Sequence, residues 1–150
     1  MNYELFMGEA LAEARLAVNR GNRPVAAVVV VNDAMVARAQ DRVGDLQDPT
    51  AHAVLLALRE ASRRLGTPQL PDATIFATLE PCAMCVGALI QADVEELVFA
   101  VPDREEGAAG TVLQLAQHAS LTRRMKVVSG IRREEAEELL DARAPRPLHR

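Results

Sequence analysis

The sequence has no tryptophan, one tyrosine and three phenylalanines among 150 residues, so its core must consist mainly of alanine, valine and leucine. It has only two cysteines, too few for the framework of a disulfide-rich domain. No apolar run comes near the roughly 20 residues that span a bilayer, and the first residues lack a basic segment followed by an apolar block. These absences exclude a disulfide scaffold and predict a cytoplasmic protein that does not enter a membrane.

An excess of positive charge is absent as well. Asp and Glu together number 21 against 17 Lys and Arg, which gives a net charge of −4. Nothing in this balance attracts nucleic acid in general, so an RNA partner would need a local basic patch. The length is typical of one domain, and we expect a single domain over residues 1–150 whose tail, from about residue 142, is loosely ordered.

Alternating apolar segments predict an α/β fold. Leu5 and Leu16 belong to a series of apolar residues at helical spacing, which predicts an amphipathic first helix with both on its apolar face. Asn32-Asp33 separates two apolar runs and predicts a tight hairpin. Strand–helix alternation further along predicts a parallel sheet covered by helices, with the hairpin as one antiparallel edge pair. The predicted strands are 25–31, 35–39, 73–79, 94–101 and 125–128, and the predicted helices after the first are 49–65, 82–91, 111–119 and 131–141.

The two cysteines, Cys82 and Cys85, form a Cys-x-x-Cys pair at the predicted beginning of a helix. Such a pair is either a redox dithiol or half of a metal site. Asp48 as N-cap and Pro49 in the first helical position place His52 in the first turn of another helix. One imidazole and two thiolates suit Zn²⁺ and leave a coordination position for water, as catalytic zinc sites do. A catalytic zinc site is therefore one interpretation, and a dithiol redox protein is the other.

Longer motifs are more specific than this pair. With them the sequence resembles the cytidine deaminase-like superfamily, and within it the bacterial tRNA adenosine deaminases. The resemblance implies a three-layer α/β/α sandwich with a five-stranded mixed sheet. It also implies a zinc ion held by His52, Cys82 and Cys85, and a homodimer with active sites near the subunit interface. The matching segments are DPTAHA at 48–53, ATLEPCAMCVGALI at 77–90, GAAG at 107–110 after Pro102-Asp103, and VVSGI at 127–131.

The sequence departs from this family at the catalytic position. The resemblance implies a Glu two residues after the zinc-binding histidine, where it moves protons while zinc activates a water, but this chain has Val54. General acid–base catalysis contributes typically about 10² to 10⁴-fold, and a valine cannot supply it. Where the family has a base-contacting Asn, this chain has Asp41, and we consider Asp41 as the substitute proton carrier. The resemblance further places Pro24, Asp41 and Ala53 around the bound base.

Two functions remain open at this point. The first is zinc-dependent hydrolytic deamination of a purine or related heterocycle, as a nucleobase, a nucleoside or adenosine in tRNA. The second is a catalytically silent binding or regulatory subunit, because Val54 replaces the proton-carrying Glu. An engineered Val54 in an ordinary enzyme is a third explanation. The last predicted helix carries Glu134, Glu135, Glu137 and Glu138, where tRNA enzymes of the family often carry basic residues, so the RNA-facing resemblance is weak there.

Overall fold

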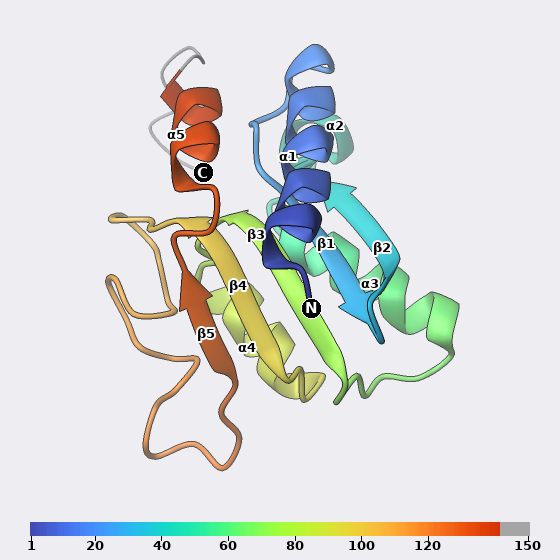
Figure 1. Cartoon of the computed structure of the whole chain (residues 1–150), viewed down its shortest axis with the longest axis vertical. Coiled ribbons are helices and arrows are strands. Elements are labelled where there is room, and N and C mark those ends of the chain that lie inside the picture. Colours follow the sequence, from blue (N-terminus) through green and yellow to red (C-terminus); the bar gives the residue numbers. More distant parts are fainter. Residues whose placement is uncertain (142–150) are drawn as a thin grey trace.

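The computed structural model describes residues 1–141 as helices packed around one five-stranded sheet (Figure 1). The strand order is β2–β1–β3–β4–β5; β1 is antiparallel to β2 and β3, whereas β3, β4 and β5 are parallel. The expected sandwich with a mixed sheet is confirmed, and the expectation for the tail from about residue 142 lies outside the described residues. The strands are β1 (Ala26–Val31), β2 (Ala34–Gln40), β3 (Ala73–Leu79), β4 (Glu96–Val101) and β5 (Lys126–Ser129), and the helices are α1 (Tyr3–Asn19), α2 (Val43–Leu46), α3 (Ala53–Leu65), α4 (Ala83–Gln91) and α5 (Arg133–Asp141).

The hairpin between β1 and β2 forms at the predicted position. Asn32 and Asp33 have φ values of 52° and 59°, because the two-residue turn that matches the twist of the strands needs positive φ at both residues. β1 then lies inside the sheet between β2 and β3, and residues 26–30 are buried. Burial on both faces explains why this strand is continuously apolar instead of alternating.

Helices cover both faces of the sheet. α1 and α5 lie in front of it in Figure 1, and α3 and α4 lie behind it. The rings of Tyr3 and Phe6 pack against that of Phe76, with centroids 5.8 and 5.6 Å apart. Around this small aromatic cluster the buried apolar residues are mostly Ala, Val and Leu, as the composition predicts. None of the helices in the described part of the chain has the length and hydrophobicity needed to cross a membrane.

The first helix is confirmed, but the prediction of its buried face is wrong. Leu5 and Leu16 are 54% and 46% exposed. The helix turns a different set of residues toward the sheet, in which small alanines permit a close approach. This buried set consists of Phe6, Met7, Ala10, Leu11, Glu13, Ala14 and Ala17.

The predicted beginning of the next long helix is also wrong. Asp48 is not an N-cap, because no helix begins at Pro49. Its Oδ1 accepts hydrogen bonds from the backbone N–H of Thr50 at 2.9 Å and from the Thr50 hydroxyl at 2.7 Å. This is the local turn that Asp residues often form in loops. α3 begins only at Ala53, after His52 in an extended conformation. The preceding segment, which lies outside every predicted helix and strand, contains the short helix α2.

Residues 111–119 form turns and not the predicted helix. The backbone N–H groups of Ala109 and Thr111 donate to the carboxylate of Glu80, at 2.9 and 3.2 Å. Gly110 between them has φ 128°, a conformation that no α-helix contains. The carboxylate alone would not prevent a helix, but the residues that follow fold back on this turn. Ala109 and Gln114 form an antiparallel β-bridge, and the N–H of Leu115 donates to the carbonyl of Ala108 at 2.9 Å instead of closing a helical turn.

Candidate metal centre

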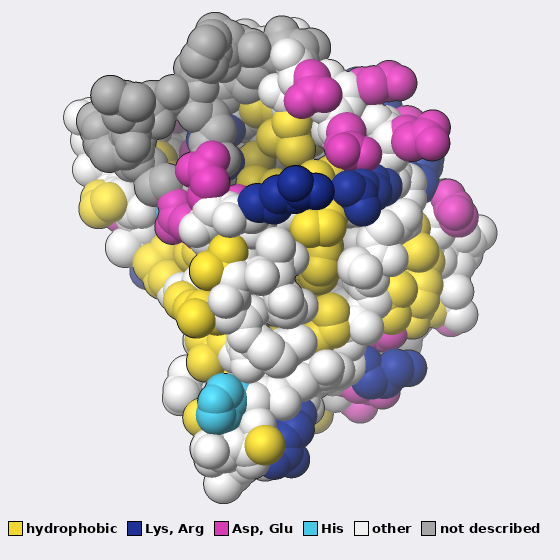
Figure 2. All heavy atoms as spheres, turned by 90° about the vertical axis from the view of Figure 1, so that its left-hand side faces the viewer, with side chains coloured by type: hydrophobic (Ala, Val, Ile, Leu, Met, Phe, Trp, Pro, Cys, Tyr) yellow, Lys and Arg dark blue, Asp and Glu magenta, His cyan; other side chains and the backbone are white. Residues whose placement is uncertain are grey.

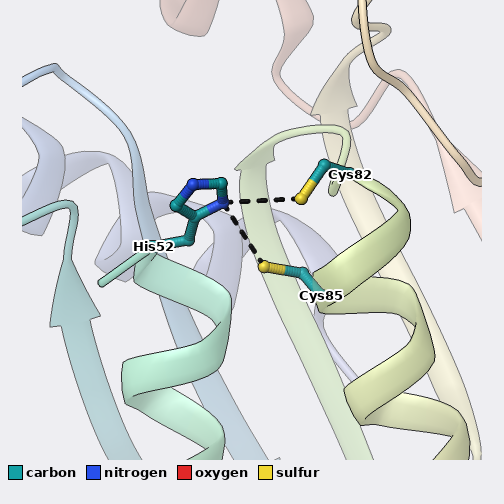
Figure 3. A group of neighbouring side chains, drawn as sticks. All are labelled: His52, Cys82 and Cys85. Atoms are coloured by element: carbon teal, nitrogen blue, oxygen red, sulfur yellow. Dashed lines mark hydrogen bonds between the residues drawn. The ribbon is translucent and has the colours of Figure 1, made fainter. Parts of the chain in front are cut away.

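Three ligand-type side chains meet where two helices begin. His52 is the N-cap residue of α3, Cys82 is the N-cap residue of α4, and Cys85 lies in the first turn of α4 (Figure 3). The Nδ1 atom of His52 lies 3.4 Å from the Sγ of Cys82 and 3.6 Å from the Sγ of Cys85. The three predicted metal ligands are thus brought together, with ligand atoms all within 4.8 Å of one another.

This donor set fits a zinc ion in both chemistry and spacing. A tetrahedral zinc with bonds of about 2.3 Å to sulfur and about 2.0 to 2.1 Å to nitrogen separates N and S ligands by about 3.6 Å. The observed separations from His52 are 3.4 and 3.6 Å. An imidazole aimed at both sulfurs is what a metal site needs and what a redox dithiol does not require. We therefore favour the metal interpretation over the dithiol one.

The electrostatics of the site favour one thiolate even without a cation. A hydrogen bond from the Cys85 thiol, assisted by His52, lowers the pKa of Cys82 to about 4. The same hydrogen bond and burial raise the pKa of Cys85 well above its usual range. The hydrogen bond to Cys82 raises the pKa of His52. The cluster therefore retains protons, and binding of a metal ion by two thiolates and a neutral imidazole must release them.

A cavity opens beside these ligands, and the chain's departures from the family lie in its wall. Ala53 and Val54 line it, and the Val54 side chain is only 4% exposed. Asp41 also lines it, so the predicted substitute carboxylate is in the cavity. Pro24 is buried next to two lining residues, Arg23 and Val25, but does not itself line the cavity.

Arg23 is a pocket residue that the sequence reasoning missed. Its guanidinium lies 3.8 Å from the Oδ2 of Asp41, and both side chains are largely buried. The other oxygen of Asp41 accepts a hydrogen bond from the backbone N–H of Val43 at 3.2 Å. The only signal for Arg23 in the sequence is a charge immediately before a buried apolar strand.

Glu80 is the second functional residue that the sequence reasoning missed, although it lies in the segment 77–90 that carries the family resemblance. Its side chain is 2% exposed and lines the cavity. Oε1 accepts hydrogen bonds from the Asp103 N–H at 3.1 Å and the Thr111 hydroxyl at 2.5 Å. Oε2 accepts from the N–H groups of Ala109 and Thr111. This carboxylate holds loop 103–111 against the metal centre.

Comparisons with known proteins agree with this geometry. The family described as "Cytidine and deoxycytidylate deaminase zinc-binding region" matches residues 1–101. The chain is 41% identical over 139 residues to a tRNA-specific adenosine deaminase of Bacillus subtilis (strain 168), covering 93% of this chain and 86% of that protein. It is 48% identical over 105 residues to a tRNA(Ile)-lysidine synthase of Thermus thermophilus, covering 70% of this chain and only 19% of that protein.

A solved structure gives a similar result. It comes from work on A-to-I editing by tRNA:A34 deaminases at the wobble position of transfer RNA. It superposes with a TM-score of 0.86 at 36% identity, covering 90% of this chain and 98% of that one. The similarity extends well beyond the motifs to nearly the whole described fold.

Proposed function

Because the chain belongs to the cytidine and deoxycytidylate deaminase zinc-binding family, we propose that it is a zinc-dependent hydrolase that converts adenosine in tRNA to inosine and ammonia. The observation that carries the proposal is the convergence of His52, Cys82 and Cys85 at one cavity. Support for the substrate comes from the B. subtilis relative, named a tRNA-specific adenosine deaminase, and from the structure concerned with tRNA:A34 deaminases.

In this proposal His52, Cys82 and Cys85 hold the zinc ion. A zinc ion with three protein ligands supplies a Lewis acid that makes water nucleophilic near neutral pH. Both cysteines lie at the N-terminus of α4, where the helix dipole stabilises their thiolates. Ala53 and the Arg23–Asp41 pair form the wall against which the base lies.

Proton transfer is assigned to Asp41. Three carboxylates line the cavity, those of Asp41, Glu80 and Asp103. Both oxygens of Glu80 are occupied by loop N–H and hydroxyl groups, and Asp103 accepts from the N–H groups of Glu105 and Glu106. Asp41 has one backbone hydrogen bond and a longer ion pair, so it is the carboxylate best able to take a proton and return it.

A second function is a silent module that binds the same substrate without turnover. The observation that favours it is Val54, which occupies the cavity wall with a side chain that carries no proton. General acid–base catalysis is typically worth about 10² to 10⁴-fold, so its loss leaves a binding site and little activity. The two functions differ only in whether Asp41 compensates for Val54.

The deciding experiment measures inosine in a tRNA anticodon stem-loop incubated with the zinc-loaded protein and two pairs of variants. If Asp41 carries the proton, Asp41→Asn lowers turnover by about 10²-fold or more, whereas the exposed control Asp72→Asn does not. If the chain is silent, the unmodified protein gives no inosine and Val54→Glu creates turnover that Val54→Gln does not. Turnover that is unchanged in Asp41→Asn rules out the assignment of Asp41.

We also propose that the chain is a homodimer and acts in the cytoplasm. The homodimer follows from the family resemblance, and light scattering tests it by measuring whether the mass in solution is twice that of one chain. A monomer at micromolar concentration would rule out the dimer. The cytoplasmic assignment is supported by the relative named as tRNA-specific, because bacterial tRNA is a cytoplasmic substrate, and fractionation of cells that express the native gene tests it.

A further inference from the structure

A groove crosses the exposed edge of the sheet at β2. It has a volume of about 360 Å³ and is bounded by the second half of α1, the last residues of β2 and the outer side of α3. β2 is an edge strand, at the end of the sheet opposite β5 (Figure 1). None of the metal ligands lines this groove, so it is a surface separate from the cavity described above.

Four arginines line this groove, and two of them form no ion pair within the described residues. Arg42 pairs with Asp45 at 3.5 Å, and Arg64 pairs with Glu60 at 2.6 Å. The guanidinium groups of the other two make no hydrogen bond or ion pair with any residue in 1–141. These two arginines, Arg20 and Arg38, are exposed, come from α1 and β2, and face a shared space.

The floor of the groove is polar and lacks one hydrogen-bond donor. Glu13 and Gln40 are 8% and 4% exposed, and the Gln40 Nε2 donates to the Glu13 Oε2 at 3.2 Å. The Gln40 Oε1 is buried and accepts no hydrogen bond within the described residues. Because this oxygen is enclosed, it makes the floor polar but is not in reach of a ligand in the groove.

The groove also lies next to the cavity along the chain. Gln40 and Arg42 line the groove, and Asp41 between them lines the cavity. Leu56, another groove residue, follows His52 by one turn of α3. The segment 40–42 therefore contributes side chains to both the groove and the cavity.

The arginines of this groove contrast with the charge of the chain as a whole. The net charge is −4, and acidic and basic side chains are mixed on the face shown in Figure 2. Clustered arginines attract phosphates and bind them through two parallel N–H donors. The groove is therefore a local basic patch of the kind that an RNA partner of an acidic chain requires.

We propose that Arg20 and Arg38, with Arg42 and Arg64 beside them, bind backbone phosphates of the RNA strand that flanks the nucleotide in the cavity. The inference deepens the proposed function and rests on it for the identity of the strand as RNA. Binding here positions the substrate and involves none of the groups assigned to the chemistry.

The test measures the affinity of the full chain for a fluorescently labelled tRNA anticodon stem-loop by anisotropy at several salt concentrations. Each phosphate contact contributes about 0.7 to 0.9 to the slope of log K against log salt, so Arg20→Ala/Arg38→Ala should lower the slope by about 1.5. At 0.1 M salt this corresponds to an affinity about 30-fold weaker. The control, Arg59→Ala/Arg133→Ala, removes the same charge from exposed residues outside the groove and should lose far less.

Equal losses in the two double variants would overturn the proposal. A second result would also overturn it. If inorganic phosphate raises the melting temperature of the unmodified protein but not that of Arg20→Ala/Arg38→Ala, and the two proteins bind RNA equally well, the groove is a site for small anions. The binding assay needs no turnover. If the protein binds RNA through these arginines but makes no inosine, the proposed activity alone is refuted. If the protein makes inosine and the double variant binds RNA with unchanged affinity, the RNA-binding role of the groove alone is refuted.

Discussion

Replacing Glu80 with Gln tests whether one buried carboxylate holds the loop beside the metal centre. Each carboxylate oxygen accepts two hydrogen bonds, and together they come from Asp103, Ala109 and Thr111. An amide nitrogen in place of either oxygen would face two donors and accept from neither. Two hydrogen bonds to a charged group are worth about 3 to 6 kcal/mol, at about 1.5 to 3 kcal/mol each.

This loss is a large part of the total stability of an ordinary domain, which is about 5 to 15 kcal/mol. For a chain of this size it predicts a fall in melting temperature of roughly 6 to 24 °C. Urea unfolding followed by circular dichroism measures the free energy directly. Glu95→Gln is the matched control, because Glu95 is exposed and its side chain makes no hydrogen bond within the described residues.

Should Glu80→Gln fail to fold, Thr111→Val provides a milder version of the same test. It removes the hydroxyl that donates to Oε1 and leaves the other three hydrogen bonds in place, so we expect a loss of about 1.5 to 3 kcal/mol. A loss below about 1 kcal/mol in Glu80→Gln, or one equal to that of Glu95→Gln, would refute the reasoning. The loop would then be held by its own turns.

Three further predictions concern other parts of the molecule. Protein purified without added metal should contain about one zinc ion per chain by mass spectrometry. The variant His52→Ala should lose this zinc, whereas the control His118→Ala, at an exposed histidine, should keep it. Equal zinc content in the two variants would refute the metal site. The hydrogen bond to a carboxylate raises the pKa of Tyr3 to about 12, from 10.0. Its contribution to stability is therefore complete below about pH 10 and is lost as the pH rises through about 12. The absorbance of this single tyrosine should show no tyrosinate at about pH 10.5 in the folded protein, and a midpoint near 10 would contradict the bond. Gly107→Ala should destabilise the fold strongly, because a Cβ there would lie 2.5 Å from two neighbouring atoms. Gly87→Ala, in open space on α4, should be neutral or stabilising by about 1 kcal/mol. Equal melting temperatures of the two variants would contradict the close packing at Gly107.

The sequence predicts most of the metal centre because its ligands are local features. Cys82 and Cys85 are three residues apart behind the break at Pro81, and the resemblance to a zinc-binding family adds His52, although the predicted beginning of its helix is wrong. The arrangement of strands was equally accessible, since β-branched runs and the Asn32-Asp33 turn carry their own signals. The cysteine pair and the strands have determinants within a few residues of each other, whereas His52 is 30 residues from Cys82 and was placed by the longer motifs.

The errors share a different cause. The first helix has apolar residues on more than one face, and only the packing of its alanines against the sheet selects the buried one. Residues 111–119 fail to form a helix because they fold back on the turn before them, and that turn is held by Glu80 from about 30 residues earlier in the chain. Arg23 and Asp41 likewise meet only after β1 and β2 have paired. Contacts between distant segments leave no periodic pattern, so sequence reasoning could not supply them.

The arginines at β2 have a consequence apart from any ligand. An edge strand offers unpaired backbone groups to which a strand from another molecule can add, and proteins protect such edges with charge. Arg64 donates to the backbone carbonyl of Val36 at 3.3 Å, and Arg38 projects from the same strand. These side chains therefore protect the open edge against aggregation. A variant that lacks them should associate through pairing of β2 edges as its concentration rises.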